Sequence, residues 1–234
     1  MYKTSKVVFS PRVRKSPYFN STIKYGAQAY SVYNHMYMPI SYEGTIQDYK
    51  NLLNSVQLWD VGVERQIQIK GPDAEALSQF LTPRNIKKCA IGQAMYTPLL
   101  DFEGGFLNDP VMLRLDENHY WFSVSDGDSL LWAQGIAAGY KFDVEIDEPD
   151  VSPLQVQGPD SAKLMSKVFG DWVNDLGFYK FKHAANVSWK GRFDHFSGPR
   201  EGVAAYAALL SLLVVIYSFF WMPGSSFRWQ LSLV

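Results

Sequence analysis

The chain has 234 residues and a formal net charge of -1 at pH 7, and 47% of its residues are hydrophobic and 15% aromatic. This length and composition exclude a disordered chain and are typical of a folded globular protein, and the balanced charge argues against a nucleic-acid partner, which needs a concentrated basic face. The single cysteine, Cys89, excludes an intrachain disulfide framework and a zinc site with several thiolates, so a reducing compartment, the cytoplasm, is expected.

The first 42 residues contain lysine, arginine and frequent serine but no acidic residue. An organelle transit peptide has this composition. The stretch Lys24–Tyr42, however, is dense in tyrosine and methionine, which is more typical of a pocket lining or of plain core. We therefore interpret residues 1–42 as a basic and aromatic arm that packs on the fold.

The next two segments are predicted as a helix followed by a strand. Thr45–Ser55 has apolar residues at helical spacing, with Thr45 as the expected N-cap. Val56–Lys70 alternates apolar and polar residues as a strand does, and its apolar members on one side are Val61, Val63, Ile67 and Ile69.

An internal repeat is the most informative feature of the chain. The run Ile67–Ala74 returns as Leu154–Ser161, and both copies contain Gly-Pro-Asp and precede an apolar-periodic segment. Each copy predicts a strand, a Gly-Pro turn and a helix opened by proline near its first turn, where a missing amide proton costs nothing. The repeat therefore indicates two related strand–Gly-Pro–helix units packed together.

Between the two copies lies the best candidate for a reacting site. Two strands, Val111–Leu115 and Tyr120–Val124, are predicted on either side of a short turn, and the pair Gly104-Gly105 precedes them. The glycines allow a sharp bend or a close approach to a ligand, which would bring Asn108 and Asp109 to the mouth of a strand. An ordinary surface turn has the same local pattern, so this alternative stays open.

The rest of the central region adds further short elements. Ser129–Ala138 is apolar at helical spacing, Phe142–Ile146 is predicted as a short strand, Asp147–Pro153 as a linker, and Leu176–Lys182 as strand-like. Because strands and helices alternate without the regularity of a barrel or a doubly wound sheet, the predicted class is α+β.

The C-terminal residues 199–234 form an atypical apolar tail. Val203–Met222 carries no charged residue, and this length is sufficient for a membrane-spanning helix. A buried core helix and out-of-frame sequence are the competing interpretations, and we favour the last. The four histidines, His35, His119, His183 and His195, show no metal-ligand spacing, so no metal is expected.

Several motifs in a fixed order resemble the folate-binding aminomethyltransferase superfamily. The resemblance extends from about Ser10 to Lys182, and within the superfamily it is greater to dimethylsulfoniopropionate demethylases than to the T-protein of glycine cleavage. The motifs that carry it are Tyr33–Met36, Trp59–Val61, Glu64–Gln66, Lys70–Ala74, Leu81–Arg84, Gly104–Val111, Ser123–Asp126 and Ser152–Pro159.

The resemblance implies a T-protein-like α+β fold in which residues 43–198 form the folate-binding region. Members continue for more than a hundred residues past Lys182, with an Arg-Ser-Gly-Trp-like motif that is not found here, so the fold is expected to be incomplete at its C-terminus. The implied cofactor is tetrahydrofolate as methyl acceptor, and the implied partner is a small-molecule substrate.

The implied catalytic residues are Asn108 and Asp109. The T-protein pattern has two aspartates here, the first of them catalytic, whereas this chain has the uncharged Asn108 in that place. Displacement of a methyl group from a sulfonium needs mainly in-line positioning, which an amide permits. The implied folate-binding residues are Tyr33, Met36, Tyr96, Gly105, Trp121 and Ser125.

Alternatives stay open for two of these residues and for the function. Tyr96 and Trp121 are equally well interpreted as plain core residues. The leading function is methyl transfer from dimethylsulfoniopropionate to tetrahydrofolate. An aminomethyltransferase or a related N-demethylase is the second hypothesis, and a non-catalytic folate-binding module anchored in a membrane through residues 203–222 is the third. The sequence predicts no oligomeric state.

Overall fold

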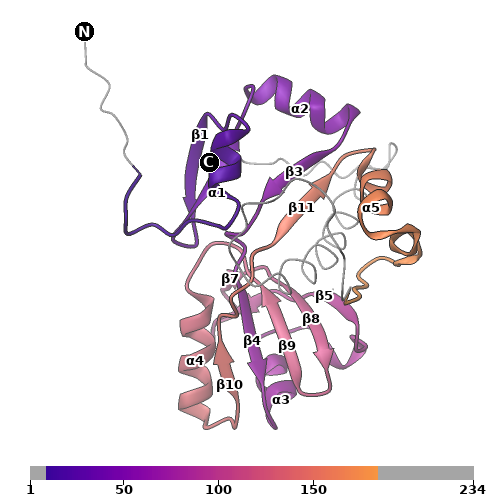
Figure 1. Cartoon of the computed structure of the whole chain (residues 1–234). Helices are drawn as coiled ribbons and strands as arrows, with labels where there is room; N and C mark the ends of the chain where they lie inside the picture. The colour runs from indigo at the N-terminus through magenta and orange to yellow at the C-terminus, as the bar shows by residue number, and fades with distance from the viewer. Residues whose placement is uncertain (1–8, 184–234) are drawn as a thin grey trace.

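The computed structural model describes residues 9–183, which form two connected parts. The larger part is built on a five-stranded antiparallel sheet (Figure 1). Its strands, in spatial order, are β10 (Glu145–Asp147), β4 (Gln66–Lys70), β9 (His119–Ser123), β8 (Val111–Asp116) and β5 (Gln93–Tyr96).

Two helices, α3 (Ala74–Phe80) and α4 (Ser129–Tyr140), pack against one face of this sheet. Because side chains alternate along a strand, β9 sends Tyr120 and Phe122 into the core under the helices and Trp121 to the other face. The helix-covered core also contains the buried residues Ile67, Ile69, Leu77, Met112 and Ile136. Helices on one face of an antiparallel sheet make this an α+β fold, as predicted.

The smaller part contains the N-terminal elements and those of the second repeat. The N-terminal segment forms α1 (Phe19–Lys24) and the hairpin of β1 (Ala29–Tyr33) and β2 (Met36–Ser41), followed by α2 (Thr45–Asn54) and β3 (Gln57–Asp60). The second repeat supplies β11 (Leu154–Gln157) and α5 (Ser161–Phe169). Three short elements belong to the larger part, namely the 3-10 helix η1 (Ile86–Lys88), β6 (Leu99–Leu100) and β7 (Phe106–Asn108), and the 3-10 helix η2 (Asp171–Asp175) follows α5.

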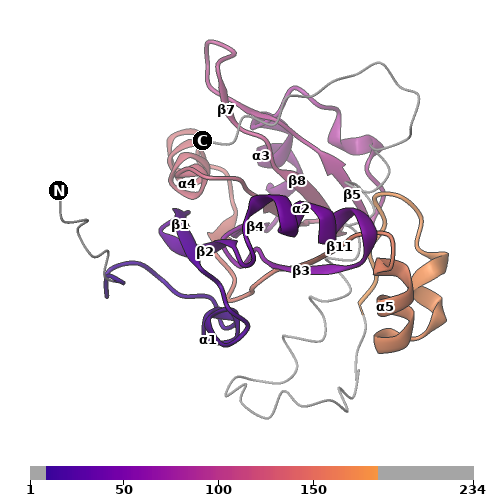
Figure 2. The same cartoon turned by 90° about the horizontal axis from the view of Figure 1, so that it is seen from above.

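A two-stranded ribbon joins the two parts. Residues 57–70 and 145–157 run antiparallel, first as the β4–β10 pair at the edge of the sheet and then as the β3–β11 pair. Figure 2 shows β3 and β11 leaving the sheet toward α5, where the buried Val156 and Met165 pack together.

The N-terminal segment is attached to this ribbon by hydrogen bonds. The Ser16 hydroxyl donates to the buried carboxylate of Asp60 at the end of β3, and the Tyr18 hydroxyl donates to the Ser152 carbonyl at 2.9 Å.

The two repeat copies fold as predicted, each into a strand, a Gly-Pro turn and a helix. Gly71 and Gly158 both adopt a positive φ, of 135° and 119°, which only glycine adopts readily. A Cβ on Gly158 would lie 2.2 Å from the Ser55 carbonyl oxygen. Each proline stands one residue before the helix N-cap, Asp73 or Asp160, and thus slightly outside the predicted first turn.

Three local predictions are wrong. Helix α2 has Gly44 as its N-cap, and Thr45 is its first residue. Val61 and Val63 lie in a turn between β3 and β4, where they are buried by packing rather than by strand alternation. Residues 176–182 form no strand, because only an isolated bridge between Gln93 and Lys180 joins them to the sheet.

The strand pair around the candidate site is confirmed, as β8 and β9 with a tight turn at Glu117 and Asn118. The predicted strand at 142–146 is shifted to Glu145–Asp147. The apolar stretch 203–222 and the tail 199–234 lie outside the described residues. Within residues 9–183, no helix combines the length and the apolar composition needed to cross a bilayer.

Candidate functional site

Asn108, the last residue of β7, connects that strand to the loop Ser125–Asp128, which we call the site loop. Its side-chain Nδ2 donates to the carbonyl oxygens of Ser125 at 3.1 Å and Asp126 at 3.3 Å. Its Oδ1 accepts from the backbone N–H and the hydroxyl of Ser125, both at 3.1 Å. Only 3% of Asn108 is exposed, so both ends of its amide are committed to holding the site loop.

Asp109 presents the exposed acidic group of the site. Its Oδ1 lies 2.5 Å from the Ser125 hydroxyl, which is shared between Asp109 and Asn108. The residue itself is exposed. The structure therefore brings the two predicted catalytic residues and Ser125 into direct contact, with one carboxylate facing open space.

A second carboxyl group, Glu64, stands close to Asp109. It lies in the turn between β3 and β4, and burial together with the negative charge of Asp109 raises its pKa to about 7. Tyr33 and Tyr96 also border the pair: burial raises the pKa of each phenol, and the charge of Asp109 adds to the effect. A carboxyl group with a pKa near neutrality can accept or hold a proton under physiological conditions.

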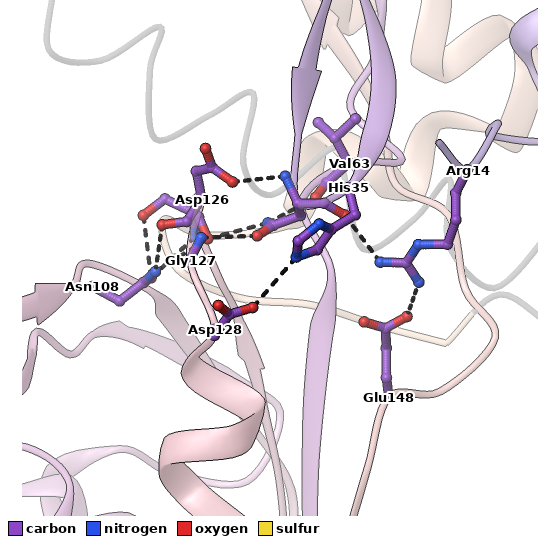
Figure 3. A network of polar contacts seen from close by, with 10 residues as sticks. Arg14, His35, Val63, Asn108, Asp126, Gly127, Asp128 and Glu148 are labelled. Atoms are coloured by element: carbon purple, nitrogen blue, oxygen red, sulfur yellow. Dashed lines mark hydrogen bonds and ion pairs between the residues drawn. The ribbon is translucent and has the colours of Figure 1, made fainter. Parts of the chain in front are cut away.

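The turn between β1 and β2 is hydrogen-bonded to the site loop (Figure 3). The Tyr33 hydroxyl interacts with the Ser125 side chain and with the backbone of Asp126. Asn34 contacts Ser125, Asp126 and Gly127. The loop is thus held by β7 and by the N-terminal hairpin together.

Of the other predicted site residues, Tyr96 borders the cluster, whereas Met36, Trp121 and Gly105 lie apart from it. Met36 is buried in β2. Trp121 is 8% exposed, packs in the core on the face of the sheet away from α3 and α4, and donates from Nε1 to Gln68 at 2.9 Å. Gly105 donates its N–H to Asp101 at 2.6 Å in the turn before β7. Tyr96 is 40% exposed beside Asp109.

Two residues of the site were not predicted from the sequence, Glu64 and Asn34. Glu64 is an acidic residue that directly follows the apolar run from Val61 to Val63, which the structure buries. Asn34 and His35 separate two aromatic-rich segments, and these residue types tolerate the positive φ of a two-residue hairpin turn. Both signals exist in the sequence, but neither distinguishes a site from a structural turn.

No group of three or more histidine, cysteine or acidic side chains within residues 9–183 is arranged to hold a metal ion. An open apolar pocket lies elsewhere, along α4 and the turn between β6 and β7, and its lining includes Phe102, Leu131, Trp132 and Tyr140. None of the predicted site residues lines it. The site itself presents the carboxyl groups of Asp109 and Glu64, the Ser125 hydroxyl and the phenols of Tyr33 and Tyr96.

Comparison with known proteins shows what this chain is similar to. The family model of the GCVT N-terminal domain matches residues 18–191. The dimethylsulfoniopropionate demethylase DmdA of Ruegeria pomeroyi is 46% identical over 176 residues, which are 75% of this chain and 48% of that protein. An aminomethyltransferase of Desulfitobacterium hafniense is 27% identical over 149 residues, 62% of this chain and 41% of that protein.

A solved structure has the same fold. The glycine cleavage system aminomethyltransferase T from Bartonella henselae superposes with a TM-score of 0.65 and 23% identity, covering 73% of this chain and 47% of that one. The chain spans about half the length of the curated relatives named above. Since the family model matches more than half of the chain, the chain belongs to the family of the GCVT N-terminal domain.

Proposed function

We propose that this chain acts as a tetrahydrofolate-dependent methyltransferase, which moves a methyl group from dimethylsulfoniopropionate to tetrahydrofolate. The similarity to the Ruegeria demethylase supports this substrate class. The proposal depends on one observation, the different roles of the adjacent residues Asn108 and Asp109. Asn108 is an uncharged amide fully used in holding the site loop, and Asp109 is the exposed carboxylate beside it.

The residues present suit a reduced folate. A pterin has flat faces and a hydrogen-bonding edge, and the site offers the phenol rings of Tyr33 and Tyr96 together with the hydroxyl of Ser125. In this proposal these three residues contact the folate. Met36 and Trp121 are buried core residues and have no direct contact with folate in this proposal, and Gly105 shapes the turn that leads into β7.

Bound tetrahydrofolate would supply N5 as the nucleophile, with the N5–methyl bond forming as the carbon–sulfur bond breaks and its electron pair stays on sulfur, giving a neutral thioether. Asp109 and Glu64 have two tasks in this reaction. Before transfer, their negative charge attracts the sulfonium cation. As the transfer proceeds, one of them receives the proton that N5 loses, a task suited to Glu64 with its pKa raised to about 7.

The test measures methyl transfer directly. The 234-residue chain is incubated without oxygen with tetrahydrofolate and dimethylsulfoniopropionate carrying deuterated methyl groups, and labelled 5-methyltetrahydrofolate is measured by mass spectrometry. Because the chain spans half of the Ruegeria relative, a chimera that continues from residue 191 with the remaining half of that protein is tested in parallel. Labelled product from either protein, reduced at least a hundredfold by Asp109→Asn but not by Glu43→Gln, supports the proposal. If neither protein forms labelled product, the substrate assignment is rejected.

An aminomethyltransferase is the second candidate, and the similarity to the Desulfitobacterium enzyme favours it. Asn108→Asp restores the pair of acidic residues that the T-protein pattern has at this turn. If that variant gains activity with an aminomethyl donor and tetrahydrofolate, the aminomethyltransferase assignment is the better one. If the variant gains no activity with the aminomethyl donor while the parent chain transfers methyl groups from dimethylsulfoniopropionate, the demethylase assignment stands.

A further inference from the structure

The turn between β1 and β2 is built to reach the site loop. Its two central residues, Asn34 and His35, have φ values of 46° and 59°. A two-residue hairpin turn requires this left-handed backbone, and asparagine is among the side chains that adopt it most readily. The conformation turns the Asn34 side chain inward, where only 6% of the residue is exposed.

Asn34 uses all of its side-chain polar atoms in contacts with other elements. Its Nδ2 donates to the carbonyl oxygens of Val63 at 3.0 Å and Ser125 at 3.1 Å. Its Oδ1 accepts from the Gly127 N–H at 3.0 Å. The backbone N–H of Asn34 donates to the Asp126 carboxylate at 2.7 Å. The side chain and the backbone N–H of Asn34 thus form hydrogen bonds with three successive residues of the site loop.

The carbonyl oxygen of Ser125 accepts two hydrogen bonds from buried side-chain amides, one from Asn34 and one from Asn108, each at 3.1 Å. These donors come from two elements more than seventy residues apart in sequence. Together they fix the backbone of Ser125, and this backbone sets the direction of the hydroxyl toward Asp109. We propose that Asn34 is a positioning residue: it holds the site loop so that Ser125 and Asp109 face the folate, an assignment that rests on the proposed function.

The turn is itself braced from outside the site (Figure 3). Arg14 donates from Nη2 to the Asn34 carbonyl oxygen at 3.0 Å and from its backbone N–H to the His35 carbonyl oxygen at 2.8 Å. Its Nη1 also pairs with the carboxylate of Glu148, in the connection between β10 and β11. The Asn34 side chain is therefore held against the loop by a turn that cannot shift freely.

The test separates the side chain of Asn34 from its backbone conformation. Asn34→Gly keeps a residue that adopts positive φ but removes the amide, so the hairpin still folds. Asn54→Ala is the matched control, because the Asn54 side chain makes one exposed hydrogen bond on α2. Hydrogen exchange of the loop amides, followed by mass spectrometry, and affinity for the stable folate 5-formyltetrahydrofolate are measured on the 234-residue chain. Urea midpoints show that each variant is folded under the assay conditions.

The expected result is at least tenfold faster exchange at residues 125–127 and at least tenfold weaker folate binding in Asn34→Gly, with Asn54→Ala equal to the parent. Unchanged exchange overturns the inference, and so does faster exchange with unchanged affinity. If the parent chain binds no folate, the proposed function fails instead, and the exchange measurement alone decides whether Asn34 holds the loop.

Discussion

Arg65 and Glu148 form an ion pair, with 3.1 Å between Nε and Oε1, at the point where the two halves of the ribbon meet. Arg65 is only 7% exposed, and its Nη1 also donates to the carbonyl oxygens of Gly62 at 3.1 Å and Val151 at 2.7 Å. The Arg65 side chain thus connects the β3–β11 pair to the β4–β10 pair through this ion pair and these hydrogen bonds.

Arg65→Met is expected to lower the free energy of unfolding by about 3 kcal/mol, because it leaves two buried carbonyl oxygens without a donor and removes the buried partner of Glu148. Urea denaturation measures the change. Arg12→Met serves as the control, since Arg12 is exposed, and should change stability by less than about 0.5 kcal/mol. An equal effect of the two substitutions would contradict the role assigned to Arg65.

The raised pKa of Glu64 predicts that stability depends on pH. Its pKa rises from an ordinary value of 4.5 to about 7, first through burial and then through the charge of Asp109. Between these values the native state binds a proton that the unfolded state does not, so stability falls as the pH rises through this window. Glu64→Gln should be more stable than the parent at pH 8 by about 1–3 kcal/mol and equal to it below pH 4.5.

Thermal unfolding from pH 4.5 to 8 tests this prediction for Glu64. The exposed Glu43 provides the matched control, because Glu43→Gln should leave the pH dependence unchanged. A Glu64→Gln profile parallel to that of the parent would mean that Glu64 is ionised in the usual range.

Asn108→Asp is expected to destabilise the site loop at neutral pH. The substitution replaces the Nδ2 donor with an oxygen that faces the carbonyl oxygens of Ser125 and Asp126, and it adds charge beside Asp109. The loss should be about 2–3 kcal/mol at pH 8 and should shrink as the pH falls toward 4, because a protonated acid again donates a hydrogen bond. Asn85→Asp is the control: its Oδ1 only accepts, from the Lys87 N–H, and a carboxylate does the same. Equal stability of the two variants at pH 8 would refute the prediction.

The Gly-Pro turn of the second repeat gives a prediction about the backbone. In Gly158→Ala the new methyl group would lie 2.2 Å from the Ser55 carbonyl oxygen at a φ of 119°, so we expect a loss of at least about 2 kcal/mol. A Cβ on Gly135 in α4 meets nothing within 4 Å, so Gly135→Ala should raise stability by up to about 1 kcal/mol. Chemical denaturation of both variants tests the pair, and a neutral Gly158→Ala would contradict the packing described here.

The sequence predicted those parts of the fold that depend on local pattern. The repeated Gly-Pro-Asp turns, the strands on either side of Glu117 and Asn118, and the helix from Ser129 follow from spacing and turn chemistry, and the structure confirms them. The predicted α+β class is also confirmed. The sequence failed where tertiary packing decides, as at Val61 and Val63, whose burial in a turn has the same apolar signature as a strand.

The candidate site was partly predictable for the same reason. Asn108 and Asp109 follow the glycine pair, and the local pattern predicted them at a strand end, whereas Ser125 was implied only by the resemblance to the superfamily. Asp109 is exposed, as expected for such a turn, but Asn108 is buried. The contacts of Asn34 with the site loop span 91 to 93 residues of sequence. The effect of Asp109 on Glu64 likewise joins distant segments. No periodicity in one sequence encodes these long-range pairings, so they require the three-dimensional structure.

The antiparallel ribbon has a consequence for how this fold can be rebuilt. Asp60 and Leu154 are paired across β3 and β11, and all five strands of the larger sheet lie between them in sequence. The chain therefore enters the larger part after Asp60 and leaves it before Leu154, at two adjacent points. Segments whose ends lie close together tolerate grafting and circular permutation. We therefore expect residues 61–153 to be exchangeable between relatives as one segment, while the acceptor keeps its own β3–β11 pair.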